Sequence, residues 1–290
     1  PQDKLKAIKS WPFIYWISDE FREKFGSDAI QDVLKPAQGA ATTNNNRFLR
    51  FWWEVANNDI SINYSEDHKK WVGYSKGGSF KKWWGNAWLL INWNNDGYEL
   101  KHSKAVLRNA DCYFKEGITY SASGSKGVSF RYLQKDCLFD VGGSCVFSNN
   151  YADNFVLLSV LHSPLIRYIS DCLNPTVNIQ VGDMQRFPIS YGKSNVLHSV
   201  GYQNVNMKKH LCQYSIIEPL YKASPISIEA DAPTSISNYY TYENALLTQI
   251  LLNESVINKT VFEVYELSEH DKQMVLEKEG VPVGDLPVSS

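Results

Sequence analysis

The 290-residue chain has no run of about 18 apolar residues, so its sequence predicts no membrane-spanning helix. It has no secretory signal pattern at its start, where Pro1 stands instead of methionine. Its five cysteines include no C-x-x-C pair, which argues against a zinc site and favours free thiols. From these absences we expect a cytoplasmic fragment of a longer protein, with no metal and no membrane partner.

The common signatures of catalysis are also missing. No G-x-G-x-x-G, no Walker phosphate loop and no H-x-x-x-H pair occurs, and residues 142–146 (GGSCV) lack the last glycine of a G-x-S-x-G elbow. Because no nucleophile, base and orienting acid assemble, we expect no bond-making chemistry from this chain alone. Whether the longer protein is an enzyme stays open at this point.

Aromatic residues and charge are unevenly distributed along the chain. All nine tryptophans fall within the first 93 residues. Residues 47–135 hold 14 lysines and arginines against 8 acidic residues, a net charge of +6, whereas residues 214–290 hold 4 against 12, a net charge of −8. A basic, ring-rich half joined to an acidic tail indicates a surface that faces phosphates.

Hydrophobic periodicity and turn residues predict an α+β fold with a mixed, curved sheet, flanking helices and a helical C-terminal segment. Pro164 should divide or kink the predicted helix 154–173, and Asn94–Gly97 should form a tight turn with positive backbone angles. The remaining expected elements are helices at 3–25, 239–266 and 268–278, strands within 47–55, 70–93, 111–120, 128–133, 137–147 and 178–189, and a linker at 222–237. We expect an N-terminal helix (1–26), a recognition domain (27–200) and a linker with an acidic helical segment (201–290).

Duplex recognition requires cations that hold phosphates, and forked amides or guanidiniums that read base edges. The basic half supplies both kinds, with glycines such as Gly77 that let backbone amides approach a phosphate. The candidate DNA contacts are Asn44, Asn45, Asn46, Arg47, Arg50, Lys70, Lys76, Lys81, Lys82, Trp83, Ser123, Ser125, Lys126 and Arg131.

Each candidate also has a purely structural interpretation. The asparagine run can be an ordinary turn, Arg50 can be an internal salt-bridge partner, and adjacent tryptophans can belong to the core and rim of a β-rich fold. Alternation along a strand would bury one ring of each pair and expose the other. The residue types alone therefore leave DNA binding as one of two open interpretations.

Longer stretches of the sequence favour the DNA-binding interpretation. Residues 35–55 (KPAQGAATTNNNRFLRFWWEV) and 70–86 (KWVGYSKGGSFKKWWGN) resemble the specificity region of large adenine-specific DNA methyltransferases. These are the type IIG restriction-modification enzymes and the related PglX methyltransferases of the BREX phage-defence system. Residues 113–120 (YFKEGITY) and 139–144 (FDVGGS) are similar to further motifs of that region, and residues 173–189 (LNPTVNIQVGDMQRFPI) to its end. This closing string is also similar to the specificity subunits of type I restriction enzymes.

The resemblance implies a target recognition domain over about residues 11–190, with double-stranded DNA and the methyltransferase half of the same polypeptide as partners. It implies S-adenosylmethionine as the cofactor of the whole enzyme, and no cofactor in this fragment. The catalytic Asn-Pro-Pro-aromatic motif of that family is absent, since Asn174-Pro175 is followed by Thr176. Its glycine-rich cofactor motif and a Pro-Asp nuclease start are absent too.

Two rival functions remain. A carbohydrate-binding β-module would also be rich in tryptophan, asparagine and glycine, although neutral sugars need no cations. A protein-interaction scaffold would use the acidic helical tail.

Overall fold

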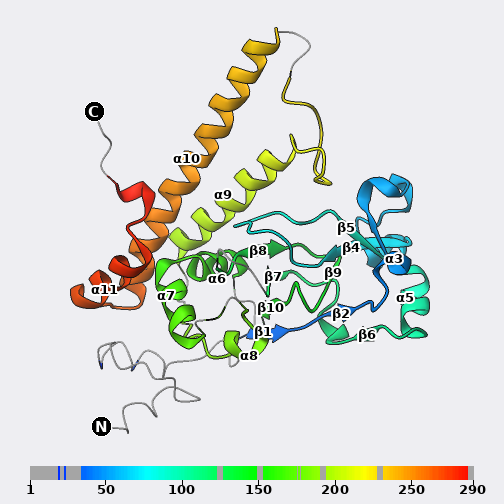
Figure 1. The fold of residues 1–290 in the computed structure, drawn as a ribbon, viewed down its shortest axis with the longest axis horizontal. Coiled ribbons are helices and arrows are strands. Elements are labelled where there is room, and N and C mark those ends of the chain that lie inside the picture. Colours follow the sequence, from blue (N-terminus) through cyan, green and yellow to red (C-terminus); the bar gives the residue numbers. More distant parts are fainter. Residues whose placement is uncertain are drawn as a thin grey trace. The chain divides into compact units, whose positions relative to one another are not determined.

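A computed structural model describes residues 34–122, 127–148, 153–174, 178–189, 194–226 and 231–286, together with Asp19, Glu23 and Thr176. The chain divides into two compact units. The β unit comprises Ile30–Asn154 and Thr176–Gln185, and the helical unit comprises Pro1–Ala29, Phe155–Pro175 and Arg186–Ser290. Figure 1 shows the helices and strands of each unit.

The described residues of the β unit form three separate sheets, none of which closes into a barrel. One sheet is fully antiparallel in the order β1-β10-β7-β8, and the second has the order β3-β5-β4-β9, in which only β4 and β9 run parallel. A third sheet pairs β2 with β6. The strands are β1 (Leu34–Ala37), β2 (Ala40–Ala41), β3 (Leu49–Phe51), β4 (Trp71–Ser75), β5 (Leu89–Asn92), β6 (Val106–Leu107), β7 (Gly117–Tyr120), β8 (Phe130–Leu133), β9 (Cys137–Phe139) and β10 (Cys145–Ser148).

Short apolar strands build the core of the β unit. All four residues of β7 are buried, and so are Cys145 to Phe147 of β10, as expected for strands covered on both faces. Phe48, Tyr74, Ile91 and Phe139 belong to one cluster of buried side chains that joins the second sheet to its neighbours. This core fixes the turns from which the candidate DNA contacts project.

Two close backbone approaches explain glycines in this unit. A Cβ atom on Gly39 would lie 1.8 Å from the carbonyl oxygen of Phe139. A Cβ atom on Gly77 would lie 2.6 Å from the carbonyl oxygen of Gly142, and the φ of Gly77 is +81°. Gly77 thus packs against protein backbone, which corrects the expectation that it leaves room for a phosphate.

The short helical pieces of the β unit sit in its connections. The tight turn predicted at 94–97 is confirmed, because Asn95, Asp96 and Gly97 all have positive φ before the helix continues. These pieces are α3 (Asn45–Phe48), η3 (Trp52–Glu54), η4 (Asn57–Asp59), α4 (Tyr64–Asp67), α5 (Asn94–Lys101), η5 (Ala110–Cys112) and α8 (Val181–Met184).

The helical unit begins with a bent pair. Helices α6 (Asn154–Leu161) and α7 (Pro164–Leu173) meet at 66°, which confirms that Pro164 divides the predicted helix. Ser163 caps α7, since its hydroxyl accepts a hydrogen bond from the backbone N–H of Ile166 at 3.3 Å. Proline is tolerated at this first position because its missing N–H would be unpaired there anyway.

Helices α9 (Asn195–Cys212) and α10 (Ala232–Val264) lie side by side (Figure 1). Between them the side chain of buried Asn253 donates a hydrogen bond to Oδ1 of buried Asn204 at 2.8 Å. Helix α11 (Glu269–Glu279) and η6 (Val283–Asp285) follow. The two helices predicted at 239–266 and 268–278 are therefore confirmed, although α10 begins seven residues earlier than predicted.

Two other expectations need correction. The strand predicted at 178–189 contains α8 instead, because the Asp183 carboxylate accepts the backbone N–H of Gln180 at 2.9 Å and starts a helical turn. The aromatic stretch 47–55 is divided among α3, β3 and η3. The helix predicted at 3–25 lies outside the described residues, apart from Asp19 and Glu23.

The α+β class and the helical C-terminal segment are confirmed, with nine α-helices and three sheets in the described part of the chain. In the same part no single helix is long and apolar enough to cross a membrane. The bent pair α6 and α7 reaches that threshold only when its two halves are taken together.

Candidate nucleic-acid interface

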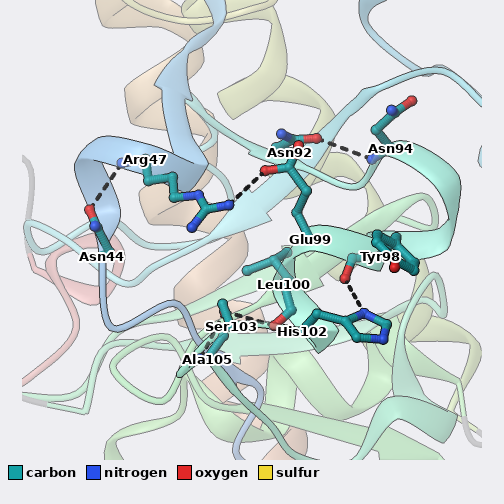
Figure 2. Close-up of polar contacts among 10 residues, drawn as sticks. All are labelled: Asn44, Arg47, Asn92, Asn94, Tyr98, Glu99, Leu100, His102, Ser103 and Ala105. Atoms are coloured by element: carbon teal, nitrogen blue, oxygen red, sulfur yellow. Dashed lines mark hydrogen bonds and ion pairs between the residues drawn. The ribbon is translucent and has the colours of Figure 1, made fainter.

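The polar turn at 44–47 is an exposed helical turn held by its own side chains. Asn44 caps α3, because its Oδ1 accepts the backbone N–H of Arg47 at 3.1 Å (Figure 2). Asn44, Asn45, Asn46 and Arg47 are all exposed, while the next residue, Phe48, is 1% exposed and anchors the turn in the core. The turn therefore presents three amides and one guanidinium to solvent, and the buried Phe48 ring holds it in place.

The Asn45 side chain makes hydrogen bonds to two other side chains, those of the buried Thr42 and of the sequence-distant Lys76. Its Oδ1 accepts the hydroxyl of Thr42 at 2.6 Å and the ammonium of Lys76 at 3.3 Å. The same ammonium lies 2.9 Å from Oδ2 of Asp140, whose side chain is 10% exposed. Lys76, predicted as a phosphate contact, is thus an ion-pair partner that also orients the Asn45 amide.

Arg47 reaches the neighbouring helix α5. Its Nη2 lies 3.2 Å from Oε2 of Glu99 (Figure 2). Its guanidinium also lies over the Phe48 ring. Both members of this ion pair are more than half exposed, so the pair contributes little to stability. Arg47 can therefore exchange Glu99 for another anion at low cost.

Arg50 has a mainly structural position. Its Nη1 donates to the carbonyl oxygens of Asn46 at 2.7 Å and Leu49 at 2.6 Å, which ties the end of α3 to β3. Its guanidinium also lies 5.8 Å from the ring centre of Trp71, and the ammonium of Lys70 lies 5.3 Å from the same ring. Lys70 is exposed and remains a candidate for contact with phosphates.

The structure corrects the expectation for Trp83 and Arg131. Trp83 is fully buried, and its backbone pairs with β8 through Phe130 and Tyr132 at 3.0 Å each. Arg131 is 1% exposed, and its guanidinium donates to the hydroxyls of Ser129 and Ser121 at 3.2 Å each. Burial lowers the pKa of Arg131 to about 10. Neither side chain is at the surface where a duplex could touch it.

The remaining predicted contacts divide into two groups. Lys81 is exposed and Lys82 is half-buried, and both belong to the connection between β4 and β5. Ser123, Ser125 and Lys126 lie outside the described residues.

Sequence reasoning missed an exposed aromatic stack. The rings of Phe51 and Trp53 lie 4.7 Å apart and within 1° of parallel, and the two residues are 40% and 48% exposed. The spacing of two residues was the available signal. Thr42, Glu99 and Asp140, which orient the predicted contacts, carried no signal beyond their polarity, because their partners are set by the fold.

Metal-ligating groups and thiols are the other reactive side chains to consider among the described residues. These residues contain no group of three or more histidine, cysteine or acidic residues that could hold a metal ion. None of the five cysteines forms a disulfide, and burial raises the pKa of the Cys137 thiol to about 12, far from that of a nucleophile. Asn174, the asparagine of the only Asn-Pro pair, ends α7 in an extended conformation.

Comparison with known proteins identifies relatives along most of the chain. It is 32% identical over 272 residues to the adenine-specific methyltransferase BrxX of Escherichia coli O9:H4 (strain HS), which covers 91% of this chain and 22% of that protein. It is 32% identical over 203 residues to the adenine-specific methyltransferase PglX of Lacticaseibacillus casei (strain Zhang), covering 65% of this chain and 17% of that protein. No protein-family model matches the chain.

The chain thus spans about a fifth of the length of the curated relatives that it matches. The resemblance to adenine-specific methyltransferases of the PglX kind is confirmed as homology to a part of such proteins. Its assignment to their target recognition region stays a prediction.

Proposed function

We propose that this chain is the DNA sequence-recognition part of a site-specific adenine-N6 DNA methyltransferase of the BREX phage-defence type. One observation carries the proposal. Nine-tenths of the chain aligns with about a fifth of an adenine-specific methyltransferase, yet its sequence has neither the catalytic Asn-Pro-Pro-aromatic motif nor the glycine-rich cofactor motif. A site-specific enzyme needs a part that selects the sequence, and a chain that is homologous to part of such an enzyme but lacks both motifs suits that role.

The exposed turn of α3 supports the proposal because its chemistry suits a duplex. Amides and guanidiniums read base edges in the major groove, and lysines neutralise phosphates. Asn44, Asn45 and Arg47 supply the first kind, and Lys70 and Lys81 supply the second. The fixed base at Phe48 holds the turn, which limits the entropy lost on binding.

The cofactor and the chemistry belong to the rest of the enzyme in this proposal. S-adenosylmethionine would supply the methyl group there, and the target adenine would leave the duplex to reach that site. The residues present do not fit the cofactor, since the sequence lacks the glycine-rich cofactor motif; it also has Thr176 where the catalytic motif requires proline. The methyltransferase half of the same polypeptide is therefore the expected partner.

The carbohydrate-binding alternative is weakened by where the tryptophans lie. Sugar platforms need exposed rings, whereas Trp71, Trp83, Trp84 and Trp93 are each at most 7% exposed. Trp53 is the one tryptophan among the described residues that is as much as 48% exposed. A neutral sugar also gives no reason for the net charge of +6 over residues 47–135.

The proposal is tested by the salt dependence of duplex binding. Binding of the chain to a fluorescent duplex should weaken steeply as salt increases, because bound counterions are released. Replacing Lys70 and Lys81 together by alanine should reduce the slope of log K against log salt by about two units. Lys272→Ala is the matched control, since Lys272 is already paired with Glu269 at 2.6 Å in the acidic segment.

Salt-independent binding, or no binding by either the chain or the complete enzyme, would refute the proposal.

A second measurement uses the complete enzyme. Exchanging the region equivalent to residues 34–189 with that of a relative of different specificity should transfer the methylated sequence, as read by methylome sequencing. Retention of the original methylated site would place specificity elsewhere.

A further inference from the structure

We propose that Asn45 selects guanine against adenine in the recognised sequence, because its side-chain amide presents only N–H donors to a ligand. This inference rests on the proposed function, since it concerns which base the DNA-recognition part prefers. It reverses the simplest expectation for asparagine, whose amide usually pairs with adenine through one donor and one acceptor.

The orientation of the Asn45 amide follows from chemistry as well as from coordinates. Its oxygen faces the ammonium of Lys76 at 3.3 Å and the hydroxyl of Thr42 at 2.6 Å. An ammonium has only donors, so the atom that faces Lys76 must be the acceptor of the amide. The amide nitrogen, with both of its protons, is therefore left for solvent or a ligand.

Buried neighbours hold this orientation. Thr42 is 2% exposed, and Asp140 fixes the Lys76 ammonium at 2.9 Å. Turning the amide over would break both hydrogen bonds to Oδ1 and place N–H protons against a cation. The two lone pairs of the amide oxygen are both engaged, so none remains for an adenine amino group.

The same pattern extends to the residues beside Asn45. The Oδ1 of Asn44 already accepts one hydrogen bond, in capping α3, and Arg47 has no acceptor at all. The exposed turn therefore offers donors at three neighbouring residues. In the major groove guanine presents two acceptors, N7 and O6, whereas adenine presents one acceptor and one donor, and cytosine presents a donor. Guanine is the base that best complements this turn.

Phosphate oxygens would accept the same donors, and the experiment must distinguish the two contacts. The probe is a library of duplexes with a randomised core, selected by the chain and sequenced. The wild-type chain should enrich guanine at one position by about tenfold, within the range for a good base contact. Asn45→Asp keeps an oxygen towards Thr42 and Lys76 but turns the outward group into an acceptor, so it should enrich cytosine on the same strand at that position.

Asn57→Asp is the matched control, because it adds the same charge at an exposed asparagine of the β unit that is not among the candidate contacts. It should lower affinity for all duplexes and leave the base preference unchanged. Thr42→Val is a second variant, which frees one lone pair on the Asn45 oxygen and should admit adenine beside guanine. Circular dichroism and thermal unfolding verify that each variant is folded.

Each outcome has one meaning. A shift from guanine to cytosine with Asn45→Asp, or relaxation towards adenine with Thr42→Val, supports the inference. Equal losses on every sequence, or an adenine preference in the wild type at the position that Asn45 governs, overturns it while leaving DNA recognition intact. Absence of salt-dependent duplex binding in the wild type and in the complete enzyme overturns the proposed function itself.

Discussion

Two buried tyrosines in one core allow the energetic role of a hydrogen bond to be measured. Tyr74 is 1% exposed and Tyr113 is 7% exposed, and both belong to the core cluster of the β unit. The Tyr74 hydroxyl donates to the carbonyl oxygen of Ala40 at 2.7 Å. The Tyr113 hydroxyl has no hydrogen-bond partner among the described residues. Replacing either by phenylalanine removes a single oxygen atom from the same core.

The two replacements should have opposite effects on the free energy of unfolding. Tyr74→Phe leaves the carbonyl of buried Ala40 without this donor, which should cost about 1–3 kcal/mol. Tyr113→Phe removes a buried hydroxyl that makes no bond, so it should be neutral or stabilising by about 1 kcal/mol. We expect the two variants to differ by about 2 kcal/mol.

Urea unfolding followed by tryptophan fluorescence measures this difference. Seven tryptophans between residues 52 and 93 lie in the β unit, so fluorescence reports mainly on that unit. Both phenols are neutral at physiological pH, since burial raises the pKa of both tyrosines, that of Tyr113 to about 12. An unchanged m-value is the control that the variants unfold by the same transition. Equal destabilisation of the two variants would mean that packing, not the hydrogen bond to Ala40, decides the outcome.

A half-buried carboxylate and two glycines give further expected outcomes. Burial raises the pKa of Asp67, but hydrogen bonds from the backbone N–H groups of Ile62 and Lys69 outweigh it and lower the pKa to about 2. Because this folded-state pKa lies below the unfolded value, the stabilisation is present above about pH 4 and is lost as the pH falls through about 2. Asp67→Asn should therefore cost about 1 kcal/mol near neutral pH and less in acid, and an equal cost at both would contradict the assignment. Gly39→Ala should destabilise the protein by several kcal/mol, because its Cβ would meet a carbonyl oxygen of β9 at 1.8 Å. Gly182→Ala in α8 should instead stabilise it by about 0.5–1 kcal/mol, because the added Cβ would enter open space. Thermal unfolding measures both changes.

Local chemistry explains which elements could be predicted from the sequence. Pro164 divides a helix because its ring is accepted only at a helix start, and Ser163 before it supplies the cap. Asn94–Gly97 forms a left-handed turn because Asn, Asp and Gly tolerate positive φ. Each of these features depends on neighbours within a few residues, so the sequence carries the full signal.

The sequence contained a signal for the start of α10, but the interpretation of this segment as a linker overlooked it. Residues 222–237 were interpreted as a linker because of their Ser, Pro and Ala content, yet Asp231 caps α10 by accepting the N–H of Thr234 at 2.9 Å. An Asp followed two residues later by a proline is a typical helix start. Composition alone therefore obscured a capping signal that spacing contained.

The burial of individual side chains could not be predicted from the sequence. Trp83 and Trp84 were expected to place one ring inside and one outside, but they are 0% and 4% exposed because a bridge to β8 covers the segment. Arg131 lies within β8 itself, between the buried Phe130 and the half-buried Tyr132. A lone arginine among aromatic residues has the same sequence appearance whether its guanidinium faces solvent or two serine hydroxyls.

The candidate site shows why residue type alone does not determine specificity. Asparagine carries one acceptor and one donor group, and from sequence either can face a ligand. In this fold Lys76, 31 residues away from Asn45, occupies the acceptor, and Asp140, a further 64 residues along, fixes Lys76. The atoms that remain for DNA are thus those that the protein has not used internally. Predicting the base therefore requires the long-range hydrogen bonds of the fold, and those bonds turn a general DNA-contact residue into a specific hypothesis about guanine.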